Sequence, residues 1–244
     1  MLEALLDLDD IVIVLAAIKK QLGDTPDVLA QNLAITMNLA RAFAAKRVRR
    51  IVFFSSAAVY GEDVQHDLIN ENTPVQPTSF YGIGKFTAER ILLKMTDGTP
   101  LLILRPALVY GPSEPGYYYG PSGFLQKALT GDPITLWGDG TELREFLHVD
   151  DVVDVARRLA ESDAIGVLNM VSGVSYTYRD ALNAITAIVG TPPVITSKAR
   201  TKEKVDHRFD GELLRRNCPG FRFTPLDEGL RRTAAAQQAT GARL

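Results

Sequence analysis

Short apolar runs alternate with longer amphipathic segments along the first 110 residues of the chain. The runs have the length of buried strands, and the segments between them repeat apolar positions every three or four residues, as helices do. The predicted order is strand, helix, strand, helix, strand, over residues 11–17, 28–48, 51–55, 79–95 and 101–104. The runs are continuously apolar, which is typical of strands whose sheet is covered on both faces. The pattern therefore predicts an α/β fold with an open, doubly wound parallel sheet.

The character of the chain changes after Gly111, where proline, glycine and aromatic residues dominate residues 111–121. Two further helices are predicted over 150–161 and 178–189, on either side of a strand over 166–171, and the last residues, from 234 to 244, are expected to fray. We therefore expect a main domain over residues 1–110, to which 140–172 returns, and a smaller lobe formed by 111–139 and 173–244.

The composition is that of an ordinary globular protein, with 46% hydrophobic and 23% charged residues. The formal net charge of −2 provides no field that would draw the chain to nucleic acid or to an anionic membrane, so neither is an expected partner. No apolar run approaches the ~20 residues needed to cross a bilayer. The single Cys218 cannot form an internal disulfide, which fits the reducing cytoplasm.

Candidate chemistry gathers where three predicted strands end, because doubly wound sheets bind their ligands outside the carboxyl ends of the strands. These ends are Ala16–Ala17, Ser55–Ser56 and Pro106–Ala107. Tyr81 and Lys85 follow at the start of the second helix and, being four residues apart, project from one helix face. A nearby ammonium stabilises a phenolate, so the pair predicts a tyrosine that acts as a general acid or base closer to neutral pH.

A set of short motifs follows the order that is typical of one enzyme family. The motifs are DIVIVLAA at 10–17, NLAITMNL at 32–39, FFSSAAVYG at 53–61, YGIGK at 81–85, RPALVYGP at 105–112, WGDG at 137–140 and REFLHVDD at 144–151. As a set they resemble the extended short-chain dehydrogenases/reductases, in particular the NAD-dependent nucleotide-sugar epimerase/dehydratase family. The resemblance implies a Rossmann-like fold with a smaller C-terminal substrate lobe. It further implies NAD as cofactor, with NADP left open, a nucleotide-diphosphate sugar as substrate, and no metal.

Matched residue by residue, the motifs imply a catalytic site made of Ser56, Tyr81 and Lys85. Ionised Tyr81 would take a proton from a sugar hydroxyl, Ser56 would orient the same oxygen, and Lys85 would lower the pKa of Tyr81 and hold the cofactor ribose. Besides Tyr81 and Lys85, the resemblance assigns cofactor contacts to Leu15, Ala16, Ala17, Lys19, Asn32, Ser55, Pro106, Ala107 and Val109. It assigns substrate contacts to Ala58, Leu108 and Arg144, with the arginine clamping the diphosphate. Two positions depart from the family pattern, which commonly has His at Val14 and Asn at Leu108.

The residues after Ser56 narrow the reaction that the resemblance implies. Family members that dehydrate or decarboxylate the sugar carry acids there, whereas this chain has Ala57 and Ala58. A 4-epimerase needs no further acid or base, because the 4-keto sugar rotates and takes the hydride back on its other face. The resemblance therefore favours an NAD-dependent nucleotide-sugar epimerase acting at C4. Two alternatives stay open: a sugar dehydrogenase or reductase that consumes external NAD(P)H, and a non-catalytic binding module.

The first predicted strand corresponds to the fourth strand of the family, so we expect the Gly-rich turn that binds the cofactor pyrophosphate to be lacking before Ile11. A misplaced gene start, an omitted segment and a natural remnant are the explanations left open. The resemblance also implies a homodimer built on the helices predicted over 28–48 and 79–95.

On this basis the residues present reach only the nicotinamide end of the cofactor, and we expect the 244-residue chain to bind NAD no more tightly than the millimolar range. Titration of the purified chain with NAD by calorimetry measures this affinity. Micromolar binding to a soluble monomer would contradict the expectation.

Overall fold

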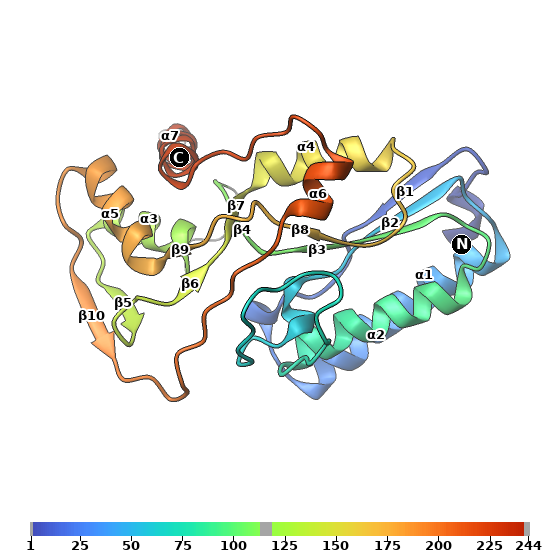
Figure 1. Cartoon of the computed structure of the whole chain (residues 1–244), viewed down its shortest axis with the longest axis horizontal. Coiled ribbons are helices and arrows are strands. Elements are labelled where there is room, and N and C mark those ends of the chain that lie inside the picture. The colour runs from blue at the N-terminus through green and yellow to red at the C-terminus, as the bar shows by residue number, and fades with distance from the viewer. Residues whose placement is uncertain (1, 113–118, 242–244) are drawn as a thin grey trace.

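The computed structural model describes residues 2–112 and 119–241 (Figure 1). Its centre is a four-stranded sheet in the order β1-β2-β3-β8, and each neighbouring pair of strands is parallel. The strands are β1 (Ile11–Val14), β2 (Arg50–Phe54), β3 (Leu101–Pro106) and β8 (Gly166–Met170). The α/β fold with a Rossmann-like parallel sheet that the sequence predicts is therefore confirmed.

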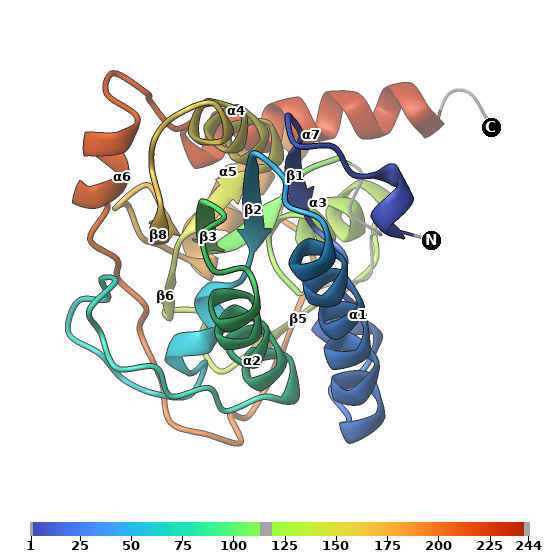
Figure 2. The ribbon, with the colours of Figure 1, turned by 90° about the vertical axis from the view of Figure 1, so that its right-hand side faces the viewer.

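Helices cover both faces of this sheet (Figures 1 and 2). The helices α1 (Pro26–Ala45) and α2 (Phe80–Met95) pack side by side on one face. On the other face lie α4 (Val149–Ala160) and the short α6 (Glu212–Asn217). No helix in the described part of the chain is both long enough and apolar enough to cross a membrane.

The strands are apolar at successive positions because the helices bury both faces of the sheet. Ile51, Phe53 and Ile103 belong to the core shared with α1 and α2, whereas Val52 and Leu104 belong to the core shared with α4. Successive side chains of a strand point to opposite faces, so each strand contributes to both cores. This burial explains why the sequence shows continuous runs here and no alternation.

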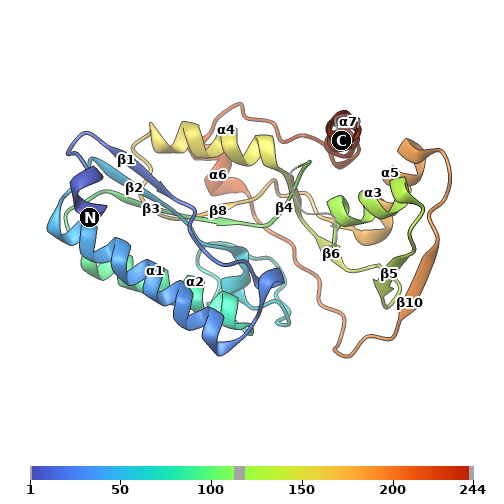
Figure 3. The ribbon, with the colours of Figure 1, turned by 180° about the vertical axis from the view of Figure 1, so that it is seen from behind.

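A smaller lobe lies beyond the carboxyl ends of the strands (Figure 3). It consists of α3 (Pro121–Thr130), β5 (Ile134–Trp137), α5 (Tyr178–Val189), β10 (Ile195–Lys198) and α7 (Leu226–Gly241). Two short strand pairs connect it to the main sheet, and these are β4 (Leu108–Tyr110) with β7 (Phe146–His148), and β6 (Leu143–Arg144) with β9 (Tyr176–Thr177). The lobe has a hydrophobic core of its own, so the cleft between the lobe and the sheet edge is bounded by packed structure on both sides.

Local sequence signals account for where the main helices begin. The Thr25 hydroxyl accepts a hydrogen bond from the Val28 amide, and Pro26 occupies the first turn, where its missing N–H costs nothing. Ser79 caps α2 in the same way. Thr177 and Asp180 form a capping box at α5, whose bounds agree with the predicted 178–189.

Three predicted boundaries differ from the structure by three residues or more. The helix predicted over 28–48 ends at Ala45, because the backbone becomes extended at Lys46. The first strand ends at Val14, three residues before the predicted end, because Val14 pairs with Phe53 and β2 itself ends one residue later.

The residues expected to fray form most of the last turns of α7, which continues to Gly241. Leu230 and Ala234 are buried against the α5 side of the lobe, and this packing stabilises the C-terminal helix. The described residues also form three short 3₁₀ helices, η1 (Leu2–Leu5), η2 (Lys20–Leu22) and η3 (Ala57–Tyr60).

Candidate active site

A cleft of about 520 Å³ opens at the carboxyl edge of the sheet, facing the smaller lobe. Ten of the site residues predicted from the sequence line it: Lys19, Ser55, Ser56, Ala58, Tyr81, Pro106, Ala107, Leu108, Val109 and Arg144. They come from the residue before η2, from the end of β2, from η3, from α2, from β3 and β4 with the residue between them, and from β6. The location agrees with the rule that doubly wound sheets bind ligands at the carboxyl ends of their strands.

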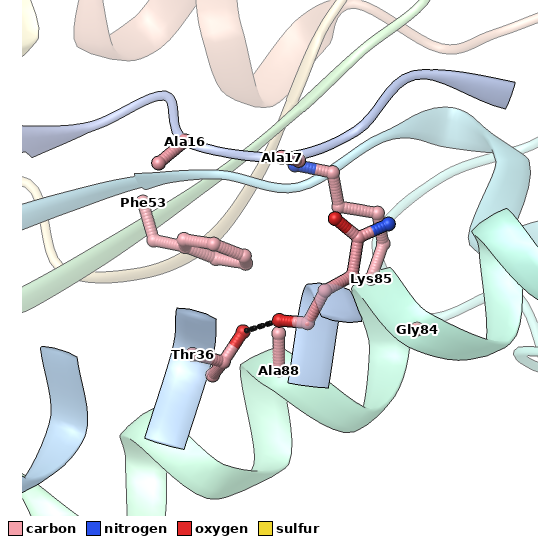
Figure 4. A pocket seen from close by; sticks show the side chains of 8 residues that line it. Ala16, Ala17, Thr36, Phe53, Gly84, Lys85 and Ala88 are labelled. Carbon is pink, nitrogen blue, oxygen red and sulfur yellow. Dashed lines mark hydrogen bonds between the residues drawn. The ribbon is translucent and has the colours of Figure 1, made fainter. Parts of the chain in front are cut away.

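A second, much smaller cavity of about 10 Å³ lies between α1 and α2 (Figure 4). The predicted residues Ala16, Ala17, Asn32 and Lys85 line it, together with Thr36, Phe53, Gly84 and Ala88. Figure 4 shows the Lys85 side chain extending from α2 toward the chain at Ala17. Leu15, also predicted to contact the cofactor, is 63% exposed and lines neither cavity.

Ser56 and Tyr81 meet because α2 begins directly above η3. The Ser56 side chain caps η3 by accepting a hydrogen bond from the Ala58 amide at 3.2 Å, and it also interacts with the Tyr81 hydroxyl. Gly82 permits the contact between the two elements, since a Cβ on it would lie 2.7 Å from the Ala58 carbonyl oxygen. The sequence motifs did not single out Gly82. A glycine in the first turn of a predicted helix, where it lowers helix stability, was the available signal.

Lys85 lies behind Tyr81 and is only 7% exposed. Its Nζ donates a hydrogen bond to the Phe54 carbonyl at 2.7 Å and lies 5.8 Å from the centroid of the Tyr81 ring. Burial lowers the pKa of Lys85 to about 8, and the charge of Glu89 opposes this shift. The ammonium is therefore near the tyrosine, as the four-residue spacing predicts, but it is itself desolvated.

The pKa of Tyr81 is raised, whereas the Tyr81–Lys85 spacing predicts that it is lowered. Burial raises the pKa of Tyr81, the Ser56 hydroxyl acts to lower it, and the negative charge of Glu62 raises it further. The desolvation of a phenolate in this covered position outweighs the help from its neighbours. Glu62, which pairs with Lys20 at 2.6 Å across the mouth of the cleft, is a second group that the sequence motifs did not single out.

Asn32 holds the backbone beside the smaller cavity. Its Oδ1 accepts a hydrogen bond from the Ile18 amide at 2.7 Å, and its Nδ2 donates to the Ile18 carbonyl at 3.1 Å. Both ends of the side-chain amide are thus used to shape the segment that follows Ala16 and Ala17. The small side chains at these two positions leave the backbone open to close approach, which fits a flat ring such as a nicotinamide.

Arg144 stands on the lobe side of the cleft. Its Nη1 donates to the Leu143 carbonyl at 2.8 Å and to the Val205 carbonyl at 2.6 Å, and its side chain also interacts with Tyr178. These contacts orient the guanidinium while leaving other N–H groups for an anion. Of the aromatic stretch near 117–119, Tyr117 and Tyr118 lie outside the described residues, whereas Tyr119 lines the cleft.

The model of the NAD dependent epimerase/dehydratase family matches residues 2–170 of this chain. The chain belongs to this family.

Within the family the chain is similar to enzymes that act on UDP-sugars. The UDP-glucose 4-epimerase of Mycolicibacterium smegmatis is 32% identical over 184 residues, which cover 72% of this chain and 58% of that protein. The UDP-glucose 4-epimerase of Thermotoga maritima, solved with UDP-glucose, superposes with a TM-score of 0.84 at 26% identity, over 94% of this chain and 77% of the other. MoeE5, solved with UDP-glucuronic acid and NAD, gives a TM-score of 0.83 at 29% identity, over 94% and 79%. The chain spans between 39% and 60% of the length of the curated relatives it matches.

Buried Glu145 and half-buried His207, on the lobe side of the cleft, have pKa values shifted in opposite directions. Burial raises the pKa of Glu145 to about 7, against hydrogen bonds that its Oε2 accepts from Ser172 and Gly173. Burial, with a smaller contribution from the positive charge of Arg144, lowers the pKa of His207 to about 4. Both shifts have the same cause, because desolvation disfavours the charged form of either group.

The two groups should contribute opposite slopes to stability against pH. As the pH falls from about 6.5 toward 4, His207 takes up a proton only in the unfolded chain, so its contribution to stability is lost. As the pH rises from about 4.5 through 7, folded Glu145 gives up a proton that the unfolded chain has already lost, so stability is lost in that direction. In wild type the slopes partly cancel between these limits.

Substituting one of the two groups should leave the pH dependence of stability that is due to the other. In His207→Gln the free energy of unfolding should fall, relative to wild type, as the pH rises from about 4.5 to 7, by roughly 2–3 kcal/mol. In Glu145→Gln it should fall by a similar amount as the pH drops from about 6.5 to 4. Urea unfolding at several pH values measures both, with Glu161→Gln on the exposed end of α4 as the control. Variants whose pH profiles run parallel to wild type would show that neither group is desolvated in the folded protein.

Proposed function

We propose that this protein is an NAD-dependent nucleotide-sugar epimerase that inverts the configuration at C4, with Ser56, Tyr81 and Lys85 as its catalytic residues. The observation that carries the proposal is the proximity of these groups at the carboxyl edge of the sheet. Ser56 interacts with Tyr81, and the Lys85 ammonium lies 5.8 Å from the Tyr81 ring. Membership of the epimerase/dehydratase family and the likeness to 4-epimerases support the same chemistry.

In the proposed reaction the Tyr81 phenolate takes the proton of the C4 hydroxyl, and Ser56 donates a hydrogen bond to the same oxygen. Lys85 stabilises the phenolate by its charge and would help to hold the cofactor at its ribose. NAD, when bound, supplies the acceptor for the C4 hydride and then its donor. The 4-keto sugar rotates in the cleft, Tyr81 returns the proton to the oxygen, and no net redox change results.

The residues around the catalytic groups suit a nicotinamide cofactor at this end of the cleft. We propose that it is held by Leu15, Ala16, Ala17, Lys19, Asn32, Ser55, Pro106, Ala107 and Val109, together with Tyr81 and Lys85. Small residues allow the ring to approach the backbone, and Lys19 provides a positive charge for a phosphate. Ser55 contributes its backbone, because its hydroxyl donates a hydrogen bond to the buried Glu89.

The substrate side of the cleft suits a neutral sugar on a nucleotide diphosphate. We propose that Ala58 and Leu108 face the sugar and that Arg144 binds the diphosphate. The alanines at 57 and 58 place no acid beside the sugar, so elimination or decarboxylation lacks a catalyst there. UDP-glucose is the substrate suggested by the relatives that act on UDP-sugars.

The cleft also suggests how the chain is divided. We propose that residues 1–110, with 140–172, carry the cofactor, and that 111–139 and 173–244 carry the substrate. The reducing cytoplasm is the proposed compartment, in keeping with the free, buried Cys218.

A homodimer through α1 and α2 is the proposed assembly. Ile83 and Leu93, both on α2, are 37% and 43% exposed and would be covered by a second copy. Light scattering at micromolar concentration should therefore give the mass of two chains, and Leu93→Glu should give the mass of one. A single-chain mass for wild type would count against the dimer.

The proposed reaction is tested by incubating the purified protein with UDP-glucose and millimolar NAD and following UDP-galactose by NMR. We expect interconversion without net NADH formation, and a loss of kcat of about 10²–10⁴ in Tyr81→Phe, which lacks the proton-transferring oxygen. Arg144→Ala should raise KM by about 10–100-fold, as for the loss of a charge-assisted hydrogen bond.

Arg216→Ala removes an exposed arginine on α6 and should change neither constant. Stoichiometric consumption of NADH or NADPH with no epimer formed would instead identify a reductase. A protein that binds the sugar nucleotide without turnover would be a binding module.

A further inference from the structure

A buried ion pair lies directly behind the proposed catalytic residues. Glu89 on α2 and Arg105 on β3 are 1% and 4% exposed. Arg105 donates two hydrogen bonds to Glu89, from Nε to Oε1 at 2.9 Å and from Nη2 to Oε2 at 2.6 Å, and Ser55 donates another to Oε1. Two buried charges are tolerated when their geometry is good and their remaining bonding positions are filled, as they are in this bidentate pair.

Arg105 also connects the ion pair to the turn that carries Ser56. Its Nη1 donates a hydrogen bond to the Tyr60 hydroxyl at 2.9 Å, and that hydroxyl donates to Oδ1 of Asn169 on β8 at 2.8 Å. Tyr60 is the last residue of η3, the 3₁₀ helix that Ser56 caps. One guanidinium therefore fixes the positions of α2, η3 and β8 relative to one another.

Glu89 lies one helical turn after Lys85, so the two side chains are neighbours on one face of α2. Its negative charge acts against the desolvation that lowers the pKa of Lys85 to about 8. Tyr81 lies one turn before Lys85 on the same helix, and Tyr60 and Arg105 are titratable groups of the network around Glu89. Lys85 also lies beside the neutral side chains of Phe53, Asn32 and Thr36.

The charged groups at the open side of the cleft are screened by solvent. Glu62 and Lys20 form an ion pair whose side chains are 35% and 39% exposed. Asp24, which accepts a hydrogen bond from the Tyr81 amide at 2.9 Å, is exposed as well. Solvent screens exposed charges at a distance, so Glu89 is the anion with the strongest electrostatic effect on Lys85.

We propose that Glu89 is a positioning residue that supplies a buried negative charge one helical turn from Lys85, and that Arg105 limits the effect of this charge on Lys85 by pairing with it. Neither Glu89 nor Arg105 lines the two cavities, so each acts through Lys85. The significance of this control for catalysis rests on the proposed function. The electrostatic arrangement itself can be measured without turnover.

The test follows the titration of Lys85 by NMR in the full chain labelled with ¹³C at lysine Cε, with the signal assigned by Lys85→Arg. Glu89→Gln removes the opposing anion and leaves Arg105 as an unpaired cation, so Lys85 should lose its proton about one pH unit or more below wild type. Arg105→Gln frees the Glu89 charge, so Lys85 should lose its proton at a higher pH than wild type. Glu89→Asp keeps a carboxylate and should restore most of the wild-type titration.

Arg90→Gln is the matched control, because it removes an exposed cation from the same helix and should leave the titration of Lys85 unchanged. An unaltered Lys85 titration in Glu89→Gln, or shifts of the same sign in Glu89→Gln and Arg105→Gln, would overturn the inference. If Glu89→Gln does not fold, the absence of an upward shift in Arg105→Gln overturns it equally. Because the titration needs neither cofactor nor substrate, the expected shifts in a protein that interconverts no sugar would reject the proposed function alone.

Discussion

The parallel pairing of β2, β3 and β8 sets the position of every other group in the cleft. Phe54 pairs with Leu104, and Pro106 pairs with Met170, so the strands deliver their carboxyl ends to the same edge of the sheet. A one-residue slip would exchange the two faces of a strand and bury the wrong side chains, and the hydrophobic cores on both faces oppose it. Ser56, Ala107 and the turn η3 therefore share an edge, and α2 is placed above them by its close contact at Gly82.

The same burial that stabilises the fold shapes the electrostatics of the cleft. Desolvation lowers the pKa values of Lys85 and His207 and raises those of Tyr81 and Glu145. A buried group that acts in its charged form therefore depends on charged or hydrogen-bonding partners at close range. The low local dielectric constant strengthens each of these interactions. The Arg105–Glu89 pair is the most buried ion pair among the described residues, and its carboxylate lies one helical turn from Lys85.

The fold and the reaction are determined at different levels in this family. In the proposed reaction a Ser, a Tyr and a Lys at the edge of the Rossmann-like sheet assist hydride and proton transfer, and the groups beside the sugar decide the fate of the oxidised sugar. In the proposed reaction Ala57, Ala58 and Leu108 stand beside the sugar, and none of them can donate or accept a proton. A reaction that returns the hydride to C4 needs no further acid or base there, which fits the proposed epimerisation.

The sequence by itself determined the order of the first three sheet strands and the two helices between them, the sheet edge at which the cleft opens, and the Tyr81–Lys85 pairing. These follow from periodicity and spacing, which are properties of neighbouring residues. Only the tertiary structure decided which groups face each other across long separations: Arg105 with Glu89, Asn32 with Ile18, and His207 and Glu145 at one cleft. It also reversed the expected direction of the Tyr81 shift, because the desolvation of a side chain depends on everything packed around it. A motif specifies which chemical groups are present. Packing decides how far each group is desolvated, and desolvation in turn decides which charge state is favoured.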